Sequence, residues 1–81
     1  MVKGRFYKAE WWCSTNTKYI ESLVTPVKIA NQYKLNYVDC EILVGKAKGS
    51  VVAINVGMNS RVKHEYFTQE AMMLENAEFF I

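Results

Sequence analysis

The fold is decided by residues 37–58, which read YVDCEILVGKAKGSVVAINVGM. Apolar side chains fill every second position before the connection 45–50 and again after it. Because successive side chains on a strand point to opposite faces, each run can bury one face and expose the other. A short loop with Gly at both ends joins the runs, so the segment predicts a β-hairpin and an antiparallel sheet. The side chains expected on the buried face are Val38, Cys40, Ile42, Val44, Val52, Ile54, Val56 and Met58.

Two further strands are expected around this hairpin. Residues 5–13 alternate in the same way, and Trp11 and Trp12 must then point to opposite faces. One indole can join the core, whereas the other needs a helix, a partner or a wet surface. Residues 61–67 mix β-prone side chains with charges, which predicts a third hairpin-connected strand at a sheet edge.

Helices are expected between these strands and at the end of the chain. Polar residues 14–17 can cap a helix whose stripe is Ile20, Leu23, Val24 and Val27. Pro26 either ends this helix near Val24 or starts a second one. We interpret residues 27–35 as helix, although their apolar spacing also fits a strand.

The last helix is expected to begin after Thr68, with Glu70 in its first turn. The apolar side expected to pack on the sheet consists of Met73, Leu74, Ala77, Phe80 and Ile81. The sequence therefore predicts a single domain over residues 1–81 of the α+β class. It is a small antiparallel sheet of about four strands with helices packed on it, in the order β-α-β-β-β-α.

The chemistry of the chain argues against an enzyme. His64 is the only histidine, and Cys13 and Cys40 are expected to be buried free thiols, although a bridge between them is possible if their strands pair. A zinc site needs about four Cys or His ligands, and the chain has three without paired spacing. We expect no catalytic residue, no metal and no cofactor.

The location expected for the protein is the cytoplasm of a cell or of an infected host. Charges at Lys3, Arg5 and Lys8 interrupt every apolar run near the N-terminus, so no signal peptide is expected. No stretch approaches the roughly 18 apolar residues that span a bilayer. We therefore expect no membrane association.

Aromatic residues exceed what a domain of this size readily hides. The 81 residues are 51% hydrophobic and include two Trp, five Tyr and four Phe. Either these rings lie half-exposed with their polar ends wet, or they form a surface patch for a partner. We favour a non-catalytic protein-binding module that uses Phe6, Lys8, Trp11 and Trp12. By broad analogy with small phage proteins for host takeover or anti-defence, it would act as an inhibitor or adaptor of a larger protein complex, and a homodimer is a companion expectation.

The alternative is a nucleic-acid-binding module. Basic and aromatic side chains alternate near the N-terminus, and the predicted hairpin tip carries two lysines. Such a pattern suits stacking on bases together with neutralisation of phosphates. The residues concerned are Lys3, Arg5, Lys8, Lys46 and Lys48.

Overall fold

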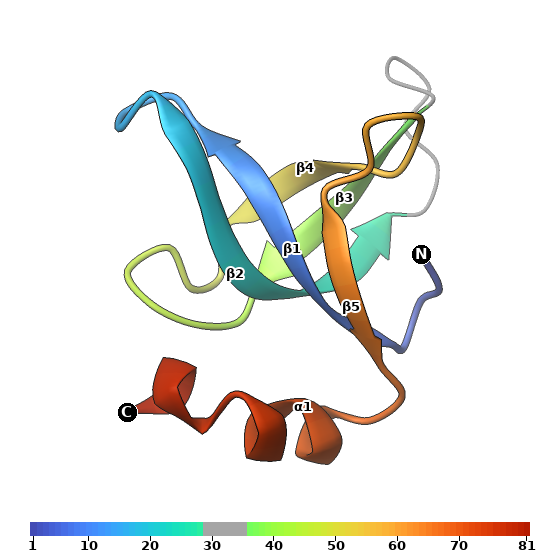
Figure 1. The fold of residues 1–81 in the computed structure, drawn as a ribbon, viewed down its shortest axis with the longest axis vertical. Coiled ribbons are helices and arrows are strands. Elements are labelled where there is room, and N and C mark those ends of the chain that lie inside the picture. The colour runs from blue at the N-terminus through green and yellow to red at the C-terminus, as the bar shows by residue number, and fades with distance from the viewer. Residues whose placement is uncertain (29–35) are drawn as a thin grey trace.

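A computed structural model describes residues 1–28 and 36–81. The elements are β1 (Phe6–Cys13), β2 (Lys18–Lys28), β3 (Tyr37–Ile42), β4 (Val51–Asn55), β5 (Val62–Tyr66), α1 (Gln69–Glu75) and the 3₁₀ turn η1 (Ala77–Phe80). The strands form one antiparallel sheet in the order β4-β3-β2-β1-β5 (Figure 1). The α+β class is confirmed. The described residues, however, form five strands rather than about four, and one α-helix rather than two.

The sheet curls so that the edge strand β4 passes close to β1. β2 pairs with β1 along its first part and with β3 along its second. β4 crosses behind β1 in Figure 1, and Cα atoms of these two strands approach within 8 Å although the strands are not neighbours in the sheet. The main core lies inside this curl.

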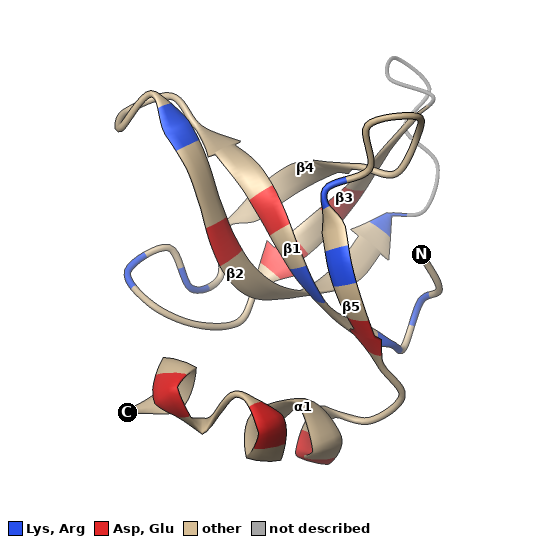
Figure 2. Ribbon diagram, in the orientation of Figure 1, with Lys and Arg blue, Asp and Glu red and all other residues tan. Residues whose placement is uncertain are grey.

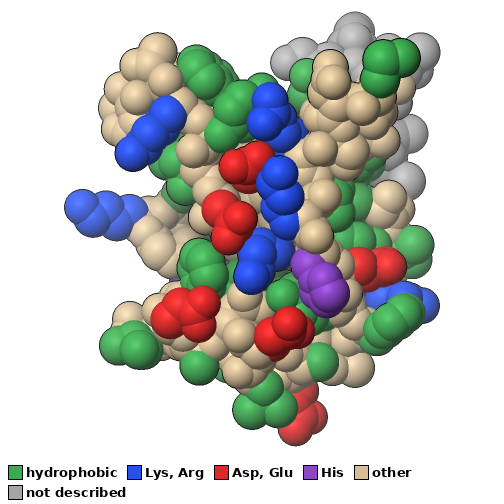
Figure 3. All heavy atoms as spheres, in the orientation of Figure 1, with side chains coloured by type: hydrophobic (Ala, Val, Ile, Leu, Met, Phe, Trp, Pro, Cys, Tyr) green, Lys and Arg blue, Asp and Glu red, His purple; other side chains and the backbone are tan. Residues whose placement is uncertain are grey.

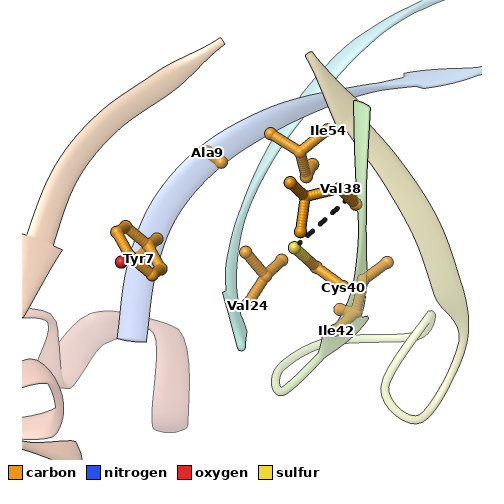
Figure 4. Close-up of a cluster of buried hydrophobic side chains, with 7 residues drawn as sticks. All are labelled: Tyr7, Ala9, Val24, Val38, Cys40, Ile42 and Ile54. Carbon is orange, nitrogen blue, oxygen red and sulfur yellow. Dashed lines mark hydrogen bonds between the residues drawn. The ribbon is translucent and has the colours of Figure 1, made fainter. Parts of the chain in front are cut away.

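Side chains from β1 to β4 make up the main core (Figure 4). At its centre is Cys40, which is fully buried and whose Sγ lies 3.6 Å from the carbonyl oxygen of Val38. A second, helix-side cluster lies between the sheet and α1. The main core contains Tyr7, Ala9, Val24, Val38, Cys40, Ile42 and Ile54, and the helix-side cluster contains Leu23, Val44, Tyr66 and Met72.

The helix predicted to follow the capping residues 14–17 is wrong, because Lys18–Lys28 form strand β2. Ser22, Leu23 and Val24 are all buried: Leu23 belongs to the helix-side cluster and Val24 to the main core. A strand covered on both faces loses the alternation of polar and apolar residues, and its apolar spacing then resembles a helix.

Pro26 does not end or start a helix; it lies inside β2. The ladder with β3 shifts register between Pro26 and Lys28. Proline has no N–H to donate, so it is tolerated in a strand at such an irregularity. Val27 and Lys28 are strand residues, so the helix interpreted over 27–35 is wrong there, while 29–35 lie outside the described residues.

The central hairpin is confirmed as β3 and β4. Gly45 and Gly49 in its loop have φ angles of 75° and 89°, where a side chain would be strained. Met58 was expected on the buried face and is fully exposed, because β4 ends at Asn55. The edge strand is also confirmed as β5, although it pairs with β1 rather than with the hairpin.

The last helix begins as expected, since the Thr68 hydroxyl accepts a hydrogen bond from the Ala71 N–H at 3.0 Å. Its orientation was predicted wrongly. Met72 and Asn76 are fully buried against the sheet, and Phe79 is half-buried beside them. The expected inner side (Met73, Leu74, Ala77, Phe80 and Ile81) faces solvent instead.

Candidate protein-binding groove

Two aromatic residues stand on the outer surface of the β1–β2 hairpin. Trp12 and Tyr19 are cross-strand partners, and their ring centroids lie 5.2 Å apart in an edge-to-face arrangement. Their side chains are nevertheless 52% and 42% exposed. Edge-to-face pairs are attractive, so each ring restrains the other while both remain accessible.

Trp11 points to the opposite face, as the alternation requires. It packs against the main core, and its indole Nε1–H donates a hydrogen bond to the Ser22 hydroxyl at 3.0 Å. This satisfies the only polar atom of the ring, which is why the indole can lie half-buried. The two adjacent tryptophans thus divide as expected, one against the core and one exposed.

Arg61 completes the cluster from the loop between β4 and β5. Its guanidinium carbon lies 3.7 Å from the centroid of the Tyr19 ring, a cation–π contact. One guanidinium nitrogen lies 3.5 Å from a carboxylate oxygen of Glu10. The backbone of Arg61 is fixed as well, because its N–H donates to Asn55 and its carbonyl accepts from Glu10, both at 2.9 Å. The position of Arg61 is therefore set before any partner arrives.

Trp12 and Tyr19 border an open hollow of about 500 Å³, which we call the aromatic groove. Figure 3 shows hydrophobic and basic side chains meeting in the notch between the β1–β2 hairpin and the loop before β5. A hollow of this size falls in the usual range for ligand pockets, roughly 300–1,000 Å³. The groove is lined by Trp11, Trp12, Tyr19, Tyr37, Val52 and Ala53.

Of the four residues predicted to bind a protein, the structure brings two together. Trp11 and Trp12 line the aromatic groove, whereas Phe6 lies at the other end of β1 and packs against the helix-side cluster. Lys8 lies between them, opposite Leu23 on β2 and His64 on β5.

Tyr19 was missed because its segment was interpreted as helix. The signal that could have found it is the short polar link 14–17 between two β-prone runs, which is typical of a hairpin. Arg61 carried no such signal, since its contact with Tyr19 depends on β5 pairing with β1.

The five residues of the alternative nucleic-acid site are not gathered into one patch. Lys46 and Lys48 are exposed on the β3–β4 loop, on the opposite side of the molecule from the N-terminal segment with Lys3 (Figure 2). Arg5 lies 3.9 Å from a carboxylate oxygen of Glu65 and 4.3 Å from the ring centroid of Phe67. Lys8 lies apart from both groups, at the centre of β1.

Neither thiol is bridged, and both cysteines are free. Burial, with a smaller contribution from the charge of Asp39, raises the pKa of the Cys40 thiol to about 12. Cys40 is therefore protonated at neutral pH and is a poor nucleophile. Residues 1–28 and 36–81 contain no group of three or more His, Cys, Asp or Glu side chains placed to hold a metal ion.

Within the part of the chain that the structure describes, no helix has the length and apolar character needed to cross a membrane. Comparisons with protein-family models, with curated proteins and with solved structures find no match to this chain.

Proposed function

We propose that the protein is a non-catalytic binding module that docks on another protein through the aromatic groove, as an inhibitor or adaptor. The observation that carries the proposal is the pair of exposed rings of Trp12 and Tyr19, with the half-buried Arg61 stacked on Tyr19. Tryptophan, tyrosine and arginine are the residue types that most often dominate the binding energy of protein interfaces.

The cluster is also ordered in advance. Trp12 and Tyr19 restrain each other, and Arg61 is held by the Tyr19 ring, by Glu10 and by its own backbone hydrogen bonds. Side chains already fixed in their bound arrangement lose little entropy on association, and each ordered side chain otherwise costs about 0.5–1.5 kcal/mol. The groove can therefore accept an apolar side chain of the partner without first being rearranged.

A second candidate function is binding of single-stranded nucleic acid. Trp12 and Tyr19 could stack on bases while Arg61 and Lys63 face phosphates. Glu10, however, lies 3.5 Å from Arg61 and 3.3 Å from Lys63 and already offsets both charges. This local neutralisation favours a protein partner.

Quantitative affinity capture from lysate tests the protein-binding proposal, with three forms of the protein as bait. Wild type and Met58→Ala should enrich the same partner, because Met58 is more exposed than Trp12 but lies outside the groove. Trp12→Ala should lower its recovery, and titration of the purified partner should show affinity weakened by at least about tenfold. Circular dichroism checks that all three are folded. A partner bound equally by Trp12→Ala would contradict the proposal.

Titration with fluorescent single-stranded oligonucleotides tests the second candidate function, binding of single-stranded nucleic acid. Nucleic-acid binding at this site predicts an affinity that falls steeply with salt and is strongly weakened in the double variant Trp12→Ala/Lys63→Ala. Absence of binding at low salt excludes it.

A further inference from the structure

The side of α1 and η1 that faces away from the sheet is apolar. Met73 is 41% exposed, Leu74 76% and Phe80 37%, and Ala77 lies exposed among them. Together with Glu70 these residues border a shallow hollow of about 410 Å³. We call Met73, Leu74, Ala77 and Phe80 the outer helix face.

This face does not turn inward to join the core, because a buried side chain on the opposite side of the helix is hydrogen-bonded to the sheet. The Asn76 side-chain amide donates to the Tyr66 hydroxyl at 2.9 Å and to the Met72 carbonyl at 3.0 Å. Asn76 and Met72 are both fully buried, and turning the helix to expose this amide would break the bond to Tyr66, whereas the bond to Met72 lies within the helix and would turn with it. The helix thus directs its richer apolar side to solvent, where Leu74 is largely uncovered and Met73 and Phe80 are only partly covered.

The outer helix face has an acidic border. Glu70, Glu75 and Glu78 belong to the two helical turns, and the sequence has no Lys or Arg after Lys63. Figure 2 shows only acidic charges on this element, and Figure 3 shows acidic and hydrophobic side chains side by side there. Among the described residues, no ion pair within 4.0 Å engages these three carboxylates. Their negative charge is therefore free to act on a partner.

We propose that the outer helix face docks a basic amphipathic segment of another protein. Apolar side chains of that segment would fill the hollow between Leu74 and Phe80, while its Lys or Arg side chains would face the three glutamates. A second copy of this chain fits less well, because a two-fold contact between helices would bring like charges together. An anionic lipid surface would be repelled for the same reason.

A designed peptide provides the probe. It has about 14 residues of Leu and Lys arranged as an amphipathic helix, carries fluorescein, and is matched by a peptide with Glu in place of Lys. Fluorescence anisotropy at about 50 mM and about 500 mM salt should show binding of the Leu–Lys peptide that weakens as salt rises, and no binding of the Leu–Glu peptide.

Four variants locate the binding site. Leu74→Ser should weaken binding of the Leu–Lys peptide about tenfold, since it removes an apolar contact that binding buries. The double variant Glu75→Gln/Glu78→Gln should weaken it about threefold at low salt and should lose most of the salt dependence. Met58→Ser, at a fully exposed position outside both surfaces, and Trp12→Ala, in the aromatic groove, should leave it unchanged. Because Trp12→Ala disrupts only the aromatic groove, unchanged peptide binding by this variant separates the outer helix face from the proposal for the groove.

Three results would overturn the inference: equal weakening by Met58→Ser and Leu74→Ser, equal binding of the Leu–Glu peptide, or no binding at low salt. Sedimentation of the unliganded protein adds a further test. A dimer that forms at high concentration and is abolished by Leu74→Ser would assign the face to a second copy instead.

Discussion

Replacing Cys40 by Ala should remove much of the loss of stability at alkaline pH. Burial raises the pKa of the Cys40 thiol to about 12, whereas the thiol of an unfolded chain titrates near about 8.5. As pH rises between these values, the unfolded state releases a proton that the folded state keeps. The free energy of unfolding therefore falls, with a slope that approaches about 1.4 kcal/mol per pH unit. Between about pH 8 and about pH 10 this amounts to about 2 kcal/mol.

Urea unfolding followed by far-UV circular dichroism at about pH 7, 8, 9 and 10 measures this effect under reducing conditions. The variant should be less stable than wild type near pH 7, because Ala leaves a small cavity. Between about pH 8 and about pH 10, however, its free energy of unfolding should fall by about 2 kcal/mol less than that of wild type. Tyr7, whose pKa is raised chiefly by burial, contributes a decline that is common to both proteins and cancels in the comparison. Parallel curves for wild type and variant would show that the thiol does not stay protonated in the folded state.

Three other substitutions test local features of the fold by urea unfolding at neutral pH. Thr68→Ala should cost about 1 kcal/mol, because it removes the hydroxyl that accepts from the Ala71 N–H; an unchanged stability would show that the cap is not needed. Tyr66→Phe should also cost about 1 kcal/mol, since the buried amide of Asn76 loses one of its two acceptors, and a neutral result would mean that water replaces the hydroxyl. Thr17→Gly should stabilise the protein by about 1 kcal/mol, because Thr17 adopts a φ of 51° at the hairpin turn; a loss of stability would exclude strain there.

The parts of the fold that were predictable are those in which one face of a strand is buried and the other is wet. Alternation alone located β3 and β4, and it placed Val38, Cys40 and Ile42 correctly in the core. The charged strand at the edge was predictable for a different reason: its charged residues suit an edge position, and Lys63, His64 and Glu65 are all exposed there. Its partner was not, because pairing of β5 with β1 joins segments more than 50 residues apart.

Strand β2 could not be predicted from its own residues. Its middle is covered by the main core on one side and by α1 on the other, so the sequence shows a buried run instead of an alternation. The same wrong interpretation of residues 18–28 also concealed Tyr19, one of the two exposed rings of the candidate site. The surplus of aromatic residues indicated an exposed ring, but the position of Tyr19 beside Trp12 follows only once residues 18–28 form a strand.

The orientation of α1 shows why counting apolar residues fails for a short helix. Five apolar residues on one side predicted that this side is buried, yet Asn76, a polar residue, lies on the buried side and is fully buried there. The amide nitrogen of a buried Asn must find acceptors, and the Tyr66 hydroxyl at 2.9 Å provides one that only this rotation can reach, whereas Oδ1 of Asn76 has no hydrogen-bond partner among the described residues. The hydrogen bond of Asn76 thus decides which side of α1 faces the sheet, although the opposite side is more apolar. The apolar side chains that stay exposed are available for a partner.

The aromatic groove and the outer helix face differ in position as well as in chemistry. In Figure 1 the molecule is viewed with its long axis vertical, and the β1–β2 hairpin lies at one end of this axis while α1 and η1 lie at the other. The axis measures 34 Å, so partners of ordinary size can occupy both ends without overlapping. One surface presents tryptophan, tyrosine and arginine, and the other presents aliphatic side chains bordered by glutamate. On the two proposals made above, surfaces of unlike chemistry would select unlike partners, and the proposals together favour an adaptor that joins two proteins over an inhibitor that covers one.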